Sequence, residues 1–416
     1  MSALTLLALA QSPASAQNAE NPSGLVPEAQ LAAAPSYDSS RPGSGLPRMV
    51  RVSSGVMLNR ETFAVADGAT GAIYFVAVSE GLLVTDVPTE PRWRSPFLAR
   101  LPGDLLAAWR GRGNSINVHT PAGELVDSIP WRHGGFGGAR LAGILPDRTP
   151  VLEKGGQQAS IPGVPAFGDD TAGDVVVRYE VESAGDLVVV AEAAVTDRVT
   201  VTVPLASGTA FSTERMIFGE RLLTARSGPH LVVAPPGAST ASAYDRTGAL
   251  VYTIPFPGAR IPVSDAQVTA QRYRRIADLR ESGVSGSKME RDSAFAAHFG
   301  KYYVPVNTDS LALLQVPAKE TAPQIDRMLA SPGGQVWFRL TAMPADTHTR
   351  WCAWDTSRRE YAFWMTLRRQ DSLLAAFGDR VLLLRRDRGH QLRILVIPFT
   401  KPGASRRPDR SIHSPC

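Results

Sequence analysis

The sequence predicts an all-β protein, built as a β-propeller, with one short helical insertion. Three observations favour this fold class. Short β-rich runs alternate with turn signals, these strand–turn–strand units recur along the chain, and the 36 glycines and 32 prolines among 416 residues suit tight turns better than long helices. A chain of this length buries a substantial core without cross-links. A propeller also leaves only short sheet edges, which protects many antiparallel strands from pairing between molecules.

Residues 1–16 are expected to be a signal peptide. Leu4–Ala10 is a short apolar run, and Ala14–Ala16 resembles a small-residue cleavage site. No Lys or Arg precedes the apolar run, so two alternatives stay open: the start codon is assigned too far downstream, or the segment is an unstructured tail. The pattern predicts an exported protein, periplasmic or extracellular.

The rest of the chain divides by composition. Residues 17–50 are rich in Ala, Pro, Ser and Asn and predict a disordered leader, residues 51–400 predict the propeller, and residues 401–416 predict a disordered basic tail. The net charge of +5 is modest, and no basic stripe with interleaved aromatics indicates a nucleic-acid partner. No later apolar stretch approaches the ~18 residues of a membrane-spanning helix. We therefore expect a soluble monomer.

The recurring units share one order: a β-rich strand, a polar turn with Asp or Gly, and a second strand. Thr62–Ala66 and Ala72–Val76 flank the first such turn. Later turns at Gly123, Gly185 and Gly248 lie about 62 residues apart, whereas a blade takes about 40–50 residues. We expect extra strands or loops between these turns, or steps of more than one blade.

The longer step from Gly248 to the turn at Asp355 contains the helical insertion, expected over about residues 263–299. Ser264 and Gln267 form an S-x-x-Q capping box, which satisfies exposed N–H groups at a helix start. Apolar residues follow at spacings of four and three. A break at Gly283–Ser287 precedes a second short helix predicted over Phe295–Phe299.

Four short motifs occur in a characteristic order. They are LPDRT at Leu145–Thr149, YDRTGALV at Tyr244–Val251, the segment Arg260–Ala266 and GGQVWF at Gly333–Phe338. Together they resemble the secreted bacterial six-bladed β-propeller proteins, related in plan to the NHL and TolB-like propellers. The resemblance covers roughly residues 60–400 and implies six blades around a central channel, but no activity. The chain departs from the pattern at Thr149 and in the Gly/Pro-rich residues 155–172, where blade boundaries are open.

No catalytic or cofactor-binding residue is predicted, because the nucleophile-elbow, zincin, EF-hand, P-loop and dinucleotide motifs are all missing from the sequence. Gly283–Ser287 has the wrong spacing for an elbow and follows a helix. His133–Gly138 is similar to an oxyanion loop but is interpreted as a turn between blades. We interpret Asp67, Asp186 and Asp245 as turn residues, and metal ligands stay unassigned.

The cysteines and tryptophans have structural interpretations. Cys352 reads as a small buried hydrophobe, and a disulfide with Cys416 stays open. Four late tryptophans are expected to pack between blades, with a carbohydrate or peptide platform as the alternative: Trp337, Trp351, Trp354 and Trp364.

Two functions compete. The first is a non-catalytic exported propeller, without a cofactor, that binds a protein, peptide or small ligand at the channel face. The alternative is a lactonase-like propeller hydrolase or lyase. In that case Asp, Glu and Asn side chains from different blades would hold a calcium ion in the channel.

Overall fold

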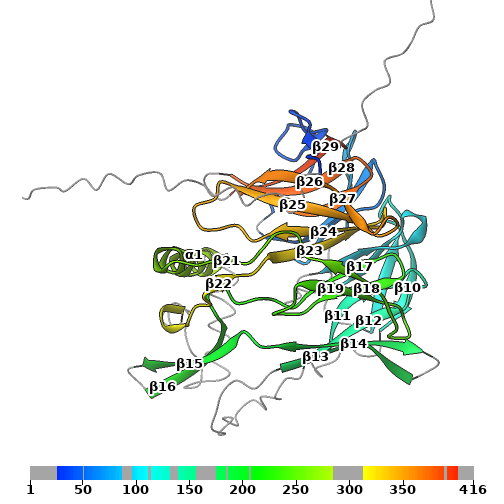
Figure 1. The fold of residues 1–416 in the computed structure, drawn as a ribbon. Coiled ribbons are helices and arrows are strands. Elements are labelled where there is room, and N and C mark those ends of the chain that lie inside the picture. Colours follow the sequence, from blue (N-terminus) through cyan, green and yellow to red (C-terminus); the bar gives the residue numbers. More distant parts are fainter. Residues whose placement is uncertain are drawn as a thin grey trace, which may run out of the picture.

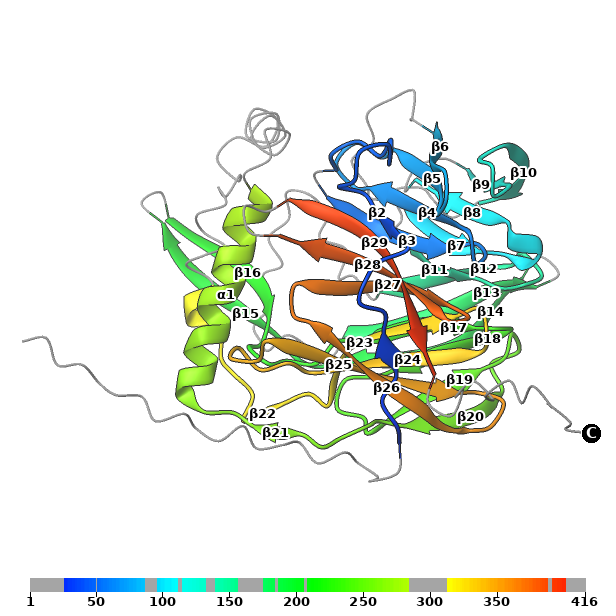
Figure 2. The ribbon, with the colours of Figure 1, turned by 90° about the horizontal axis from the view of Figure 1, so that it is seen from above.

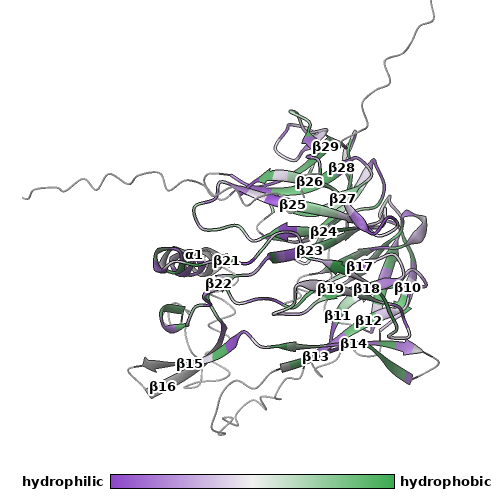
Figure 3. Ribbon diagram, in the orientation of Figure 1, coloured by the Kyte–Doolittle hydropathy of each residue, from purple (hydrophilic) through white to green (hydrophobic). Residues whose placement is uncertain are grey.

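The computed structural model describes residues 26–49, 51–86, 96–110, 114–131, 139–155, 175–183, 186–205, 208–283, 313–387 and 391–401. Six antiparallel sheets are arranged as blades around one axis (Figures 1 and 2). The predicted all-β, six-bladed propeller is confirmed. Hydrophobic residues run through the blade strands (Figure 3), and all six residues of β4 are buried.

The blades follow one another in sequence order. Blade 1 contains β3 (Val52–Met57), β4 (Thr62–Asp67), β5 (Ile73–Ala77) and β6 (Gly81–Asp86), and blade 2 contains β7 (Phe97–Arg100), β8 (Leu106–Trp109), β9 (Ser115–His119) and β10 (Leu125–Pro130). Blade 3 contains β11 (Ala139–Ile144), β12 (Pro150–Gly155), β13 (Val175–Ser183) and β14 (Asp186–Val195), and blade 4 contains β17 (Leu223–Ser227), β18 (His230–Ala234), β19 (Thr240–Tyr244) and β20 (Leu250–Pro255). Blade 5 contains β23 (Ile325–Ser331), β24 (Gln335–Leu340), β25 (His348–Asp355) and β26 (Glu360–Arg368).

Blade 6 closes the ring with strands from both ends of the described chain. It contains β27 (Asp371–Phe377), β28 (Arg380–Arg386) and β29 (Leu392–Thr400), and the short strands β1 (Gln30–Leu31) and β2 (Tyr37–Asp38) both pair with β29. The first strands of neighbouring blades contact one another in a closed circuit: β3, β7, β11, β17, β23, β27 and β3 again. These six strands surround the propeller axis.

The N-terminal strands correct the prediction of a disordered leader over residues 17–50 for its described part, residues 26–49, while residues 17–25 and residue 50 lie outside the described residues. Ala29 and Tyr37 are buried, and Tyr37 packs edge-on against Phe63 with ring centroids 5.2 Å apart. Trp364 Nε1 donates to the Val26 carbonyl oxygen at 3.1 Å, which fastens the same segment to blade 5. Composition alone did not predict these strands, because a strand of two residues shows too little alternation of apolar and polar residues to be recognised. The strands form because the open edge of β29 supplies their hydrogen-bond partners.

The predicted repeat corresponds to single blades. The turns at Gly123, Gly248 and Asp355 each join the third and fourth strands of a blade, and Gly185 lies in sequence between β13 and β14. The steps between these turns are long because connections carry extra elements. The hairpin of β15 (Arg198–Leu205) and β16 (Gly208–Arg215), for example, separates blade 3 from blade 4.

The predicted helix is α1 (Asp265–Gly283), between blades 4 and 5. Its capping box is confirmed: Gln267 Oε1 accepts from the Ser264 amide at 2.8 Å, and Ser264 Oγ accepts from the Gln267 amide at 3.4 Å. The predicted second helix over Phe295–Phe299 lies outside the described residues. Strands β21 (Ile261–Pro262) and β22 (Thr321–Ala322) pair at the base of the insertion.

The hairpin β15–β16, helix α1 and the β21–β22 pair form one accessory unit beside the propeller (Figure 2). They share a hydrophobic cluster, whose buried members are Val201, Ile217, Phe218, Ile276, Leu313, Val316, Ala322 and Met343. Two buried carboxylates anchor the unit. Asp197 accepts from Lys319 Nζ at 2.8 Å, and Glu220 pairs with Arg260 at 2.6 Å.

The cysteine and tryptophan interpretations are confirmed in part. Cys352 is buried and unpaired, while Cys416 lies outside the described residues. Trp337, Trp351 and Trp354 are buried in the packing between strands, and Trp364 is half-buried. Within the described part of the chain, no helix combines the length and apolar character needed to cross a membrane.

Candidate functional site

The aspartates singled out from the sequence lie at turns. Asp67 Oδ1 accepts from the Ala69 amide at 2.9 Å, and Asp245 Oδ1 accepts from the Thr247 amide at 2.8 Å. Asp186 is exposed at the start of β14. These carboxylates stand on separate blades and do not converge on one site. Residues 133–138 and 284–287, which carry the two catalytic-looking glycine motifs, lie outside the described residues.

The axis carries arginines at the end where the inner strands finish. Arg226 donates to the carbonyl oxygens of Ile144 at 2.6 Å and Arg100 at 2.8 Å. Arg100 donates to the Leu58 carbonyl oxygen at 2.5 Å, and its guanidinium lies 5.1 Å from the Phe377 ring centroid. Two guanidiniums thereby connect blades 1, 2, 3, 4 and 6. We call this group the arginine plug.

Burial lowers the pKa of Arg226, and the neighbouring Arg100 cation lowers it further. A cation set of this kind is the reverse of the oxygen-ligand cage that calcium requires. Among the described residues, no three His, Cys, Asp or Glu side chains lie close enough together to hold a metal ion.

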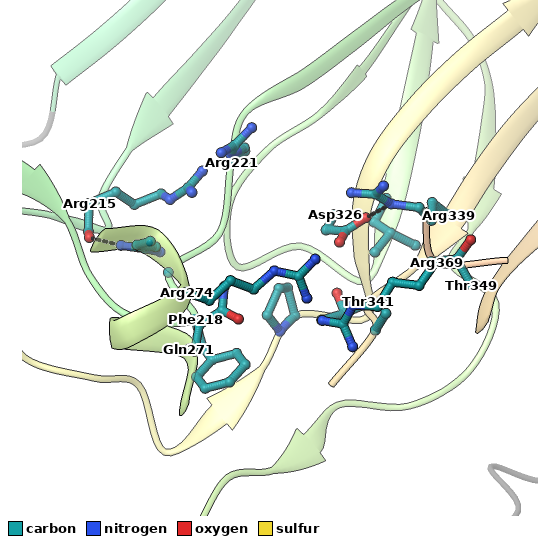
Figure 4. A pocket seen from close by; sticks show the side chains of 15 residues that line it. Arg215, Phe218, Arg221, Gln271, Arg274, Asp326, Arg339, Thr341, Thr349 and Arg369 are labelled. Carbon is teal, nitrogen blue, oxygen red and sulfur yellow. Dashed lines mark hydrogen bonds and ion pairs between the residues drawn. The ribbon is translucent and has the colours of Figure 1, made fainter. Parts of the chain in front are cut away.

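A cavity of about 270 Å³ lies at the opposite end of the inner strands, between the accessory unit and blade 5. Most of its polar side chains come from the ends of separate elements (Figure 4). The charged and hydroxyl side chains that line it are Arg215, Arg221, Arg274, Arg275, Asp326, Arg339, Thr341, Thr349 and Arg369. We call this cavity the arginine pocket.

Six arginines therefore face a single carboxylate within the described lining. That carboxylate is already engaged, because Asp326 Oδ1 accepts from Arg339 Nε at 2.5 Å. The remaining positive charge of the pocket has no acidic counterpart among its lining residues.

Two of the arginines are held in place by backbone carbonyls. Arg275 donates to the carbonyl oxygens of Arg215 at 2.7 Å and Met216 at 2.8 Å. Arg369 Nη1 donates to those of Pro344 at 2.9 Å and Asp346 at 2.7 Å, and also contacts the Met343 carbonyl. These bonds fix the geometry of the pocket but leave its charge intact.

The other donors are unengaged. Among the described residues, the guanidiniums of Arg215, Arg221 and Arg274 have neither an ion-pair partner nor an acceptor. The hydroxyls of Thr341 and Thr349 also have no partner there, and Thr349 is only 5% exposed. Leaving a buried polar group unpaired costs about 1–3 kcal/mol, and the buried atoms here are Arg215 Nε and the hydroxyls of Thr341 and Thr349. Arg221 and Arg274 are exposed, and they add positive charge at the mouth of the same cavity. Together these groups indicate a site arranged for a ligand.

The crowding of cations changes their titration. Burial lowers the pKa of Arg327, beside the pocket, to about 10, with further lowering by Arg339 and Arg221 and a partial offset by Asp326. The pKa of Arg275 is lowered by burial and then by Arg221. Arg221 reaches solvent, yet the packed atoms around it lower its pKa, with a partial offset by the Asp326 carboxylate and a smaller lowering by Arg339. A pKa of about 10 still leaves the guanidinium charged at neutral pH, so an incoming anion would relieve like-charge repulsion.

Sequence reasoning missed this pocket. Its arginines are separated along the chain from residue 215 to residue 369, and each looks like an ordinary surface cation in its own segment. The one local signal was the run Arg272–Arg275 in α1, where two arginines fall side by side on an otherwise amphipathic helix. Convergence is set by the accessory unit docking beside blade 5.

Comparisons with known proteins assign no family to the chain. No protein-family model and no curated protein sequence matches the chain. Among solved structures, it is similar to the calcium-binding protein regucalcin from Agrobacterium tumefaciens (11% identity, 85% of this chain and 92% of that chain, TM-score 0.36). It is also similar to a gluconolactonase from Xanthomonas campestris (13%, 85% and 87%, 0.34) and to a duf4221 family member from Bacteroides vulgatus (8%, 90% and 99%, 0.37). At these scores the similarities carry no argument about function.

Proposed function

We propose that this protein is a non-catalytic, ligand-binding propeller whose arginine pocket binds an anionic small molecule. The observation that carries the proposal is the convergence of Arg215, Arg221 and Arg274, none of which has an ion-pair partner among the described residues, on a cavity that also holds the unpaired Thr349 hydroxyl. Guanidinium groups match the oxygens of carboxylates and phosphates in geometry and charge.

The arrangement supports binding better than catalysis. Arginines at this pocket stay protonated near neutral pH, so they neither accept a proton as a base nor act as a nucleophile. Among the described residues, the lining contains no His, Cys, Lys or Glu side chain, and the single Asp in that lining is paired with Arg339. At the end of the axis opposite to the pocket, the positive charge of the arginine plug also disfavours a bound cation. These features favour the non-catalytic hypothesis over a calcium-dependent hydrolase or lyase.

Calorimetric titration of the full chain tests the proposal. Pyrophosphate, phosphate, succinate and acetate are titrated at pH 7 and low salt, with glycerol as the neutral probe. We expect at least one anion to bind at a single site, with affinity that falls as salt rises. The double variant R221Q/R274Q should lose at least about tenfold in affinity.

The matched control is R178Q/R246Q, which removes the same two charges from exposed arginines outside the pocket. Its affinity should equal that of the original protein. Failure of every anion to bind, or equal loss in R178Q/R246Q, would remove the proposal. Conversion of the bound anion to a product, followed by NMR, or stoichiometric calcium in the purified protein, would favour the enzyme alternative.

Export and membership of the NHL/TolB-like secreted propellers belong to the same proposal. The apolar run and the Ala14–Ala16 site support export. N-terminal sequencing of the protein recovered outside the cytoplasm should begin near Gln17, and a chain that retains Met1 would contradict export.

A further inference from the structure

The donors of the arginine pocket belong to two opposed walls. Figure 4 shows Arg215, Arg221 and Arg274 entering from one side, and Arg339 and Arg369 from the other. The first wall, the insertion wall, consists of Arg215 at the end of β16, Arg274 on α1 and Arg221 just before β17. The second, the blade wall, consists of Thr341, Thr349 and Arg369, all carried by blade 5 or the segments next to its strands.

The two walls differ in how their donors are held. On the insertion wall, three guanidiniums have no acceptor among the described residues. On the blade wall, Arg369 Nη1 is anchored to backbone carbonyls, and the hydroxyls of Thr341 and Thr349 have no partner among the described residues. Each wall therefore has its own set of donors for one oxyanion group.

The size of the cavity also exceeds the needs of one small ion. Its volume of about 270 Å³ is close to the lower end of small-molecule pockets, about 300 Å³, which is more than one five-atom oxyanion fills. An ion bound at one wall would leave the donors of the opposite wall unpaired, at the usual cost of unmade hydrogen bonds.

We infer that the ligand is a compact molecule with two oxyanion groups, one held by the insertion wall and one by the blade wall. This inference rests on the proposed function and names the ligand class of the same site. Two phosphoryl groups or two carboxylates satisfy the same chemistry, since a guanidinium group can donate two parallel hydrogen bonds to the oxygens of either. The ligand then bridges the accessory unit and blade 5.

The test compares one-headed and two-headed anions at equal ionic strength. The one-headed probes are phosphate and acetate, and the two-headed probes are pyrophosphate, malonate, succinate and glutarate. We expect the best two-headed anion to bind at least about 30-fold more tightly than its one-headed partner, because the second group binds intramolecularly. Preference for pyrophosphate or for a dicarboxylate of one length identifies the source of the two groups.

Two single variants test the two walls separately. R274Q removes a donor of the insertion wall, and T349V removes a hydroxyl of the blade wall with little change in shape. Each variant should lower the affinity for the two-headed anion by at least about fivefold. In R274Q/T349V the two losses should multiply, because each head contacts its own wall and the two walls share no contact.

Thermal unfolding shows whether each variant is folded, and T349V should melt within a few degrees of the original protein because its hydroxyl has no partner to lose. One-headed anions that bind as tightly as two-headed ones overturn the inference and leave the proposed function standing. Unchanged affinity for the two-headed anion in R274Q or in T349V also overturns it. Absence of binding by every anion removes both.

Discussion

The two ends of the inner strands use arginine in opposite ways. At one end, Arg226 and Arg100 donate to backbone carbonyls of neighbouring blades and hold the ring together. At the other end, Arg215, Arg221 and Arg274 face a cavity without an acceptor among the described residues. The same side chain is structural where carbonyls surround it and available to a ligand where they do not. The two roles differ in whether hydrogen-bond acceptors of the protein surround the guanidinium, and not in the number of positive charges.

Removing the arginine plug should have the largest effect on stability. In R226L, the carbonyls of Ile144 and Arg100 lose their donor, so we expect the free energy of unfolding to fall by about 2–4 kcal/mol. Urea unfolding at pH 7 measures the change. Anion affinity should stay within about twofold, since the plug lies at the opposite end from the pocket. A loss of affinity as large as that of R221Q/R274Q would erase the distinction between the two ends.

The next effect concerns the anchor of the accessory unit. Asp197 accepts from the Glu220 amide at 2.6 Å and from Lys319 Nζ, and it is buried. D197A should lower the free energy of unfolding by about 2 kcal/mol and loosen the unit. Amide hydrogen exchange should accelerate in β15, β16 and α1 but not in the strands of blade 1, and anion affinity should fall. Unchanged exchange in α1 would show that other contacts position the insertion wall.

A buried thiol, whose burial outweighs the neighbouring Arg350 cation, extends the comparison. Burial raises the pKa of Cys352 from 9.0 to about 12. Below pH 9 the thiol is neutral in both states. Between pH 9 and about 12 the unfolded chain loses the proton first, so the folded state binds more protons and stability falls as pH rises, by about 1.4 kcal/mol per unit at most.

Urea unfolding at pH 8 and pH 10 measures this contribution, with C352A as the matched variant. The decrease from pH 8 to pH 10 should be about 1 kcal/mol smaller in C352A, because the variant has no thiol to titrate. Thiol reagents should label Cys352 only after unfolding. Rapid labelling of the folded protein at this position would contradict its burial.

The smallest expected effect comes from one pocket arginine without ligand. Arg221 lies near Arg339 and Arg275, whose like charges oppose it, and near Asp326, whose carboxylate attracts it. Because these effects offset one another, R221Q should change the free energy of unfolding of the unliganded protein by no more than about 0.5 kcal/mol. Denaturant unfolding in low salt checks this, with R246Q as the control. A clear destabilisation by R221Q would show that Arg221 has a structural role, like the arginines of the plug, and is not held available for a ligand.

The outcome of sequence reasoning differed between the repeating part and the insertions. Asp245 and Asp355 marked hairpins because an Asp carboxylate bonds the amides that follow it, a local interaction readable from a few residues. Ser264 and Gln267 marked the start of α1 for the same reason. The strands at Gln30–Leu31 and Tyr37–Asp38 were missed, because their partner β29 lies more than 350 residues away.

The sequence by itself determined the all-β class, the spacing of hairpins and the position of α1, since each depends on side chains within one or two turns of each other. The tertiary structure alone decided which strands close the last blade and which arginines are free. Arg226 and Arg274 look alike in the sequence. Docking between blades gives one of them carbonyl acceptors and leaves the other facing a cavity, because hydrogen-bond partners distant in sequence are chosen only when the ring closes.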